Sequence, residues 1–244
     1  MSRTLQRTLG QWDLVMIVVG AVIGSGIFIV PSAVLQQTGG NAGTALTVWL
    51  LAGLLSLLGA LTYGELGAMN PEAGGLYAYI RDAFGPLPAF LFGWTQFFVI
   101  SSGSVATLAV AFTRYLDVLV PLTPIVQRVA AIGMIAVVAA INVRGTRGSA
   151  RVQNWSTGFK ALALVAISLA LLAFGGRLGE GAAPFWPEAV DLSVLSGVGM
   201  AMIGVLWAYE GWQYVTYSAG EAVDPQRVFP RALLIGTSSL IAIY

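Results

Sequence analysis

Long apolar runs separated by short polar stretches dominate this 244-residue chain. The runs cover, approximately, residues 14–35, 44–68, 87–119, 124–142, 156–175, 192–218 and 232–244. A helix needs about 20 apolar residues to cross the hydrocarbon core of a bilayer. The first six runs therefore predict membrane-spanning helices. The last run is too short to span, so we expect the chain to stop inside a seventh helix.

A glycine-rich stretch at 22–28 interrupts the first run. Gly24 and Gly26 flank Ser25 there, and inside a helix each glycine costs about 1 kcal/mol relative to alanine. Lipid offers no hydrogen bonds to the freed backbone groups, so such a break must face protein or a wet cavity. The half-helix ends would offer N–H groups to a carboxylate and carbonyls to an ammonium, which suits a zwitterion. In the alternative interpretation, the two glycines only let another helix approach closely.

The sixth run carries a second interruption at 207–213, where Glu210 and Gly211 lie among aromatic residues. A carboxylate at mid-membrane costs about 2.5–3.5 kcal/mol, so it normally faces a partner or a cavity. A pair of interrupted helices is the best sequence indication of a transporter site near the bilayer midplane. The alternative interpretation places Glu210 near a membrane interface, because residues 213–219 are only moderately apolar.

Lys160 is the second charge inside a predicted span. In one interpretation its ammonium projects into the protein and binds carbonyls exposed by the break in the first helix. In the other, the lysine stem snorkels to the headgroups, since the predicted cytoplasmic end near Gln153 is about two turns away. The residue pattern does not decide between the two.

The composition limits the class of protein. Hydrophobic residues make up 57% and charged residues 9% of the chain, whereas soluble domains carry about 25% charged residues. The chain has no cysteine and no histidine, which argues against disulfides, thiolate metal sites, an intramembrane metalloprotease and a haem protein. No nucleophile–base set suggests an enzyme, and we expect no metal and no cofactor. The formal net charge of +1 without a basic tract gives no indication of nucleic-acid binding.

Basic residues near the ends of the spans predict the orientation of the chain. One side of the membrane would carry Arg3, Arg7, Arg81, Arg144, Arg147, Arg151, Arg227 and Arg231. The other side would carry Arg114, Arg128 and Arg177. The amino terminus is therefore predicted to be cytoplasmic. The loop at 70–81 would be cytoplasmic too, either as an interfacial gate helix or as a plain connector, and the loop at 175–190 would be external.

These features together resemble the amino acid–polyamine–organocation superfamily, and within it the bacterial L-type amino acid transporter branch with its serine/threonine exchangers. The stretches that carry the resemblance are 20–28, 65–75, 152–154 with Lys160, 207–212, and 220–227 with 230–232. They follow one another along the whole chain in the order typical of the superfamily. The resemblance implies an all-α integral membrane protein with the inverted-repeat fold of leucine transporters, five helices plus five, with discontinuous helices 1 and 6. Residues 1–244 would be one truncated transporter domain, with the first repeat at 1–175 and the start of the second at 190–244.

The resemblance also implies a substrate site. The carboxylate of an amino acid would rest on Ser25, Gly26 and Ile27. Its amine would meet carbonyls around Val22, Ile23, Trp207 and Ala208. Trp207 would cover the substrate from outside, Glu210 would narrow the side-chain pocket in favour of small or polar substrates, and Ser104 would be a weaker candidate for its wall.

Lys160 matches the lysine that replaces a sodium ion in such relatives, which implies sodium-independent transport. We predict an amino acid exchanger of the bacterial cytoplasmic membrane. A proton-coupled symporter, with Glu210 or Lys160 as the titrating group, and a non-transporting amino acid sensor are the alternatives. Some mammalian relatives pair with a glycoprotein through a disulfide, and the absence of cysteine argues against that covalent heavy chain here.

Overall fold

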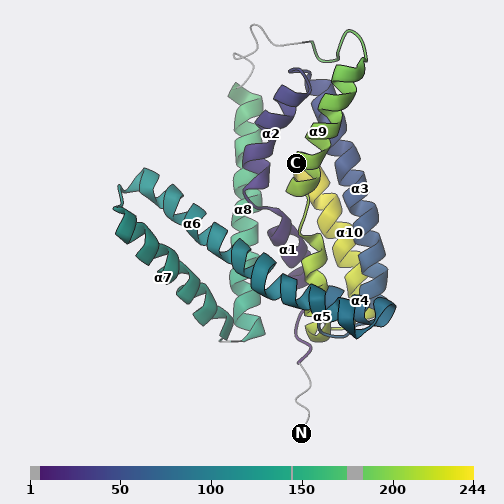
Figure 1. Ribbon diagram of the computed structural model, residues 1–244, viewed down its shortest axis with the longest axis vertical. Coiled ribbons are helices and arrows are strands. Elements are labelled where there is room, and N and C mark those ends of the chain that lie inside the picture. Colours follow the sequence, from purple (N-terminus) through teal and green to yellow (C-terminus); the bar gives the residue numbers. More distant parts are fainter. Residues whose placement is uncertain (1–5, 144, 175–183) are drawn as a thin grey trace. The chain divides into compact units, whose positions relative to one another are not determined.

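The computed structural model describes residues 6–143, 145–174 and 184–244. Throughout these residues the elements are helices, and no strand element is present (Figure 1). Among the described residues, five helical spans are long and apolar enough to cross a membrane, and there are six if a bent pair of helices counts as one span. The predicted all-α, multi-pass membrane architecture is confirmed.

The chain divides into two compact units, which are described separately. The first unit comprises Met1–Gly75 and Val152–Tyr244, and the second comprises Leu76–Arg151. The helices of the first unit are α1 (Gln11–Val22), α2 (Gly26–Gln37), α3 (Ala42–Met69), most of α8 (Thr146–Phe174), α9 (Leu192–Ala208), the 3₁₀ helix η3 (Trp212–Glu221) and α10 (Pro225–Ile243).

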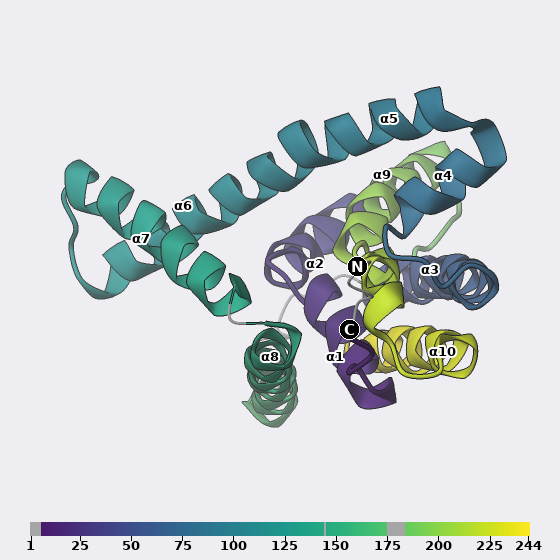
Figure 2. The ribbon, with the colours of Figure 1, turned by 90° about the horizontal axis from the view of Figure 1, so that it is seen from below.

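In the first unit, segments far apart in the sequence lie side by side. Helix α10 packs along α3 and α1, and α2 packs along α9 (Figure 1, Figure 2). Large side chains fill the contacts completely, among them Leu14 on α1 and Leu233 on α10, each 0% exposed. The two interrupted segments of the chain are thereby held in one core.

The second unit contains α4 (Leu76–Phe84), α5 (Pro86–Thr95), α6 (Ser102–Leu119), α7 (Pro124–Val143) and the first turns of α8. A π-helical segment, η1 (Gln96–Ser101), joins α5 to α6, and together they form one span. Helix α4 lies in the predicted cytoplasmic loop and is a short helix rather than an irregular connector. A proline stands at the first position of α5 and of α7, where its missing N–H costs nothing.

Two helices begin earlier than the apolar pattern indicates. Helix α8 starts at Thr146 rather than near 156, and α10 starts at Pro225 rather than at 232. Polar residues continue a helix beyond the apolar run, because backbone hydrogen bonds do not require apolar side chains. Asp224, with φ of 50°, and Pro225 set the sharp start of α10.

Helix α9 begins at a capped terminus outside its apolar run. The Asp191 side chain accepts a hydrogen bond from the Val194 N–H at 3.0 Å and one from Ser193 Oγ at 2.7 Å. These bonds lower the pKa of Asp191 below its ordinary value, and the bond from Ser193 has the largest effect. Arg3, Arg144, Arg177 and residues 175–183 of the predicted external loop lie outside the described residues.

Candidate functional site

The first interruption separates α1 from α2. Helix α1 ends at Val22, Ile23 has an extended backbone with φ −68° and ψ 91°, and α2 begins at Gly26. The two helices are bent by 49° relative to one another. No side chain caps the amino terminus of α2 at Ser25. The first N–H groups of α2 are thus without the side-chain acceptor that usually satisfies one of them.

The second interruption follows α9. Helix α9 ends at Ala208, and Gly211 then adopts φ of 127°, a conformation that residues with a side chain rarely take. The chain resumes as η3 at Trp212. Glycine is therefore required at position 211 by the backbone itself.

The two interruptions contact each other. A Cβ atom added to Gly26 would lie 3.1 Å from Ala208 Cα, and one added to Gly211 would lie 2.9 Å from the Ala21 carbonyl oxygen. The start of α2 thus contacts the end of α9, and the break after α9 contacts the end of α1. Gly26 serves the close approach of a helix, as one of the two interpretations predicts, and this contact also brings the backbone groups of both breaks to one place.

Lys160 reaches the end of α1. Its Nζ donates to the carbonyl oxygens of Gly20 and Ile23, at 2.8 Å each. These are carbonyls of the last helical turn and of the residue that follows it, which have no partner within the helix. The ammonium points into the protein at this break, and in this conformation it does not snorkel to the headgroups.

Lys160 is the last of three side chains of α8 that bind α1, spaced three residues apart. Asn154 Nδ2 donates to Asp13 Oδ1 at 2.7 Å, and Thr157 Oγ1 donates to the Met16 carbonyl at 3.2 Å. Residues three apart lie on one face of a helix. We call Asn154, Thr157 and Lys160 the α8 ladder.

Gly20 makes room for this ladder. A Cβ atom at Gly20 would collide with Thr157 Oγ1 and with the Gln153 side chain. Any larger residue would push α8 away from α1. The glycine thereby holds Lys160 within reach of the break.

The Val22 carbonyl, a predicted acceptor for the substrate amine, also has a protein partner. The Tyr244 hydroxyl donates to it at 3.2 Å. Tyr244 packs against Tyr209 and Trp49, with ring centroids 5.2 and 5.7 Å away. A carbonyl oxygen has two lone pairs, so Val22 and Ile23 each keep one acceptor position.

The other predicted site residues differ in burial and in whether they lie at the helix breaks. Ala208 is buried beside Gly26, and the Trp207 ring also lies there, 3.4 Å from where a Cβ of Gly26 would be, although Trp207 is 58% exposed. Glu210 is exposed and accepts a hydrogen bond from Gln213 Nε2. Ser104 lies in α6 of the second unit and is exposed.

Several residues at this place were not predicted to take part. Asp13, Thr157 and Tyr244 contact the first interruption or the ladder that leads to it. The spacing of Asn154, Thr157 and Lys160 is a signal that a search for polar residues three apart on an apolar helix would find. Nothing in the sequence indicates Tyr244, because its contact joins positions 222 residues apart.

Comparison with known proteins gives consistent matches. The family model described as "Amino acid permease" matches residues 9–244. The chain is 36% identical to human b(0,+)-type amino acid transporter 1 over 249 residues, which cover 100% of this chain and 50% of the relative. It is 35% identical to human cystine/glutamate transporter, covering 91% of this chain and 44% of the relative. For human Asc-type amino acid transporter 1 the identity is 33%, with 98% and 47% covered. The chain thus spans about half the length of these relatives.

Proposed function

Because the chain belongs to the amino acid permease family, a family of transporters rather than enzymes, we propose that the intact protein carries amino acids across a membrane. The names of the relatives support an amino acid substrate, since all three are amino acid transporters. The contact between the two helix breaks supports it as well. Such paired breaks offer backbone donors to a carboxylate and backbone acceptors to an ammonium.

The proposed transport is independent of sodium, and the observation that carries this is the position of Lys160. Its ammonium donates to the carbonyls of Gly20 and Ile23, which are the kind of ligand that a sodium ion would use at a helix break. A fixed positive charge repels a second cation at the same place and satisfies the same oxygen atoms.

In the proposed binding mode, the carboxylate accepts from N–H groups at Ser25, Gly26 and Ile27. The amine uses the remaining acceptor positions of Val22 and Ile23 together with the carbonyls of Trp207 and Ala208, and the Trp207 ring is the outer cover. Glu210 narrows the side-chain pocket and favours small or polar side chains, and Ser104 is kept as a weaker candidate for the pocket wall. The proposed substrates are small or neutral L-amino acids.

We further propose that transport is an exchange of amino acids by alternating access in a bacterial cytoplasmic membrane, with the amino terminus inside. The absence of cysteine supports a protein without a disulfide-linked heavy chain. The arrangement as two inverted repeats, with the first at 1–175, is part of the same proposal.

The test is uptake of labelled serine into liposomes that contain the intact protein. The liposomes are preloaded with unlabelled serine or left empty, and sodium and pH gradients are varied independently. The expected result is uptake into preloaded liposomes only, unaffected by sodium and by a proton gradient. A requirement for sodium would contradict the role given to Lys160.

The same experiment separates the alternatives. Uptake into empty liposomes that follows a proton gradient would make the protein a symporter, and variants Lys160→Met and Glu210→Gln would then identify the titrating group. Binding of serine, measured by calorimetry, without uptake under any gradient would make it a sensor.

A further inference from the structure

Helix α1 lies between two helices of the first unit, and its contacts with them differ in chemistry. The part of α8 that belongs to this unit is on one side and α10 is on the other (Figure 1, Figure 2). The contact with α10 is apolar and close. Val18 is 0% exposed, and a Cβ atom added to Gly236 of α10 would lie 2.6 Å from Val18 Cγ1. Separating these two helices would expose closely packed apolar surface, which is unfavourable.

The contact with α8 is made by polar side chains. The hydrogen bonds of the α8 ladder join α8 to Asp13, to the Met16 carbonyl and to the end of α1. Among the described residues of α8, only Thr157 and Leu164 are buried. A hydrogen bond between protein groups can be exchanged for bonds to water at a small net cost. The ladder is therefore the side of α1 that separates more easily.

The bond of the ladder farthest from the helix break leaves a polar atom unsatisfied. Asn154 Nδ2 donates to Asp13 Oδ1 at 2.7 Å, and Asp13 Oδ2 accepts from the Gly10 N–H at 3.0 Å. Asn154 Oδ1, in contrast, is buried and has no hydrogen-bond partner among the described residues. A buried acceptor without a donor is unfavourable, and contact with water removes that penalty. The closed ladder thus favours the entry of water at this end.

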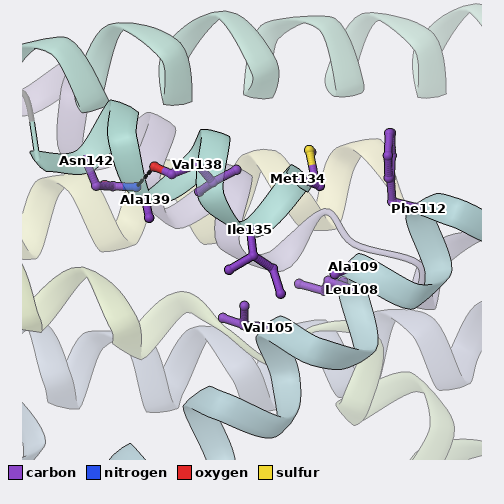
Figure 3. A pocket seen from close by; sticks show the side chains of 9 residues that line it. All are labelled: Val105, Leu108, Ala109, Phe112, Met134, Ile135, Val138, Ala139 and Asn142. Carbon is purple, nitrogen blue, oxygen red and sulfur yellow. Dashed lines mark hydrogen bonds between the residues drawn. The ribbon is translucent and has the colours of Figure 1, made fainter. Parts of the chain in front are cut away.

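Asn142 of α7, in the second unit, provides a contrast. It is the one polar residue in the lining of an apolar groove between α6 and α7, where Leu108 and Ile135 point toward one another (Figure 3). Its Nδ2 donates to the Val138 carbonyl at 2.9 Å, and its Oδ1 accepts from Ser149 Oγ at 2.6 Å. Both ends of this amide are bonded, so this asparagine gives water no reason to enter.

We propose that the α8 ladder is the cytoplasmic gate of the substrate site, with the bond between Asn154 and Asp13 as its latch. Helix α8 separates from the beginning of α1, while α1 remains packed on α10. The ladder runs from the first turn of α1 to the carbonyls at the break, so its opening connects the cytoplasm with the place where the amine binds. This inference rests on the proposed transport by alternating access and on the predicted cytoplasmic amino terminus.

The test is the rate at which a cysteine at the break reacts with a membrane-impermeant methanethiosulfonate at pH 8. Ser25→Cys is introduced into the intact protein, from which any cysteine outside residues 1–244 has been removed. Inside-out vesicles present the cytoplasmic face to the reagent. Asn154→Asp places a second carboxylate opposite Asp13, and the two charges repel one another. We expect this variant to react about tenfold faster, because it loses a hydrogen bond to a charged group.

Two further variants test the latch and the ladder separately. Asp13→Asn/Asn154→Asp exchanges the partners and re-forms a bond between an amide and a carboxylate, so the rate should return to within about twofold of the parent. Thr157→Val keeps the volume of the side chain and removes the bond to Met16, and it should raise the rate about threefold.

The matched control is Asn142→Asp, which makes the same substitution at the asparagine of the second unit and should leave the rate unchanged. Melting curves verify that each variant is folded. An unchanged rate in both Asn154→Asp and Thr157→Val, or a rise confined to right-side-out vesicles, would overturn the proposed gate. A double variant that reacts as fast as Asn154→Asp would overturn the latch. Serine exchange by the wild type is measured in parallel, and its absence would contradict the proposed function rather than the gate, which is judged by the labelling rates.

Discussion

Single residues at the first helix break have distinct structural roles, because backbone carbonyl groups there have no hydrogen-bond donor within the helix. Ile23 provides a carbonyl, Lys160 donates to it, and Gly20 lets the lysine approach. An unpaired acceptor inside a membrane protein has no water to turn to. The lysine therefore contributes to the geometry of the break as well as to its charge.

Replacing Lys160 by alanine tests this contribution. Lys160→Ala leaves the carbonyls of Gly20 and Ile23 without their donor, and an unsatisfied buried acceptor costs about 1–3 kcal/mol. We expect serine exchange without sodium to fall about tenfold or more in liposomes. The control is Phe159→Ala on the same helix, whose side chain is 75% exposed and should tolerate truncation. Full exchange activity of Lys160→Ala would contradict this contribution and would favour a lysine whose side chain extends to the headgroups during transport.

The two glycines of the first break are expected to differ. A Cβ at Gly26 would lie 3.1 Å from Ala208 Cα, whereas a Cβ at Gly24 would meet only the Val22 carbonyl at 3.8 Å. Overpacking costs about 1–3 kcal/mol. Gly26→Ala should therefore weaken serine binding about tenfold and lower the melting temperature by a few degrees, while Gly24→Ala should change neither.

Calorimetric titration and thermal melting of the two variants provide these measurements. Equal behaviour of Gly24→Ala and Gly26→Ala would contradict the close contact between the breaks. A loss of binding in Gly26→Ala at unchanged melting temperature would favour the backbone N–H groups as the carboxylate site over a purely structural role.

At the scale of elements, the first unit joins the segment that precedes α1 to the connection between η3 and α10. Leu9 forms a parallel β-bridge with Ala222. The N–H groups of Thr8 and Leu9 donate to the Glu221 carbonyl at 2.8 and 2.9 Å, and the Val223 N–H donates to the Leu9 carbonyl at 2.9 Å. The two segments thus belong to the same packed body as the two helix breaks.

A disulfide across this bridge should form without disturbing function. Neighbouring strands are about 4.7–4.9 Å apart, within the usual Cα separation of about 4.4–6.8 Å for a disulfide. The chain has no cysteine of its own, so Leu9→Cys/Ala222→Cys introduces a single pair. We expect complete cross-linking by mild oxidation, seen by mass spectrometry, with serine exchange retained.

The control pair is Leu9→Cys/Asp191→Cys, which places the second thiol at the far end of α9 and should not cross-link. Loss of exchange in the oxidised Leu9→Cys/Ala222→Cys protein, restored by reductant, would mean that the two segments separate during transport. That outcome would contradict the expectation that the two segments stay packed together during transport.

At the scale of the whole molecule, the orientation in the membrane remains a prediction from the distribution of arginines. It places the end of α3 in the cytoplasm and the end of α6 outside. Met69 and Leu119 mark these two ends, and each is 80% exposed. Their equal exposure makes them a matched pair for labelling.

Single-cysteine variants Met69→Cys and Leu119→Cys should respond differently to a membrane-impermeant maleimide on intact cells. Leu119→Cys should label at once, and Met69→Cys only after the cells are permeabilised. The reverse pattern would invert the proposed topology, and with it the side of the membrane to which the α8 ladder opens.

The sequence by itself determined the spans, the two interruptions and the family. Apolar runs long enough to cross a bilayer, and glycines and charges inside such runs, are local signals that solvent and backbone chemistry impose on each segment separately. It also indicated Lys160 as exceptional, because a lone charge in a span requires a partner.

The tertiary structure alone decided which partner each of these groups has. The partners of Lys160 became known only when α8 was seen against α1, and the neighbour of Gly26 only when Ala208 was seen beside it. The contacts of Asp13 with Asn154 and of Tyr244 with Val22 join positions more than 100 residues apart. A local pattern carries no information on such pairs, because they depend on how the helices pack once the apolar surfaces of all of them are buried together.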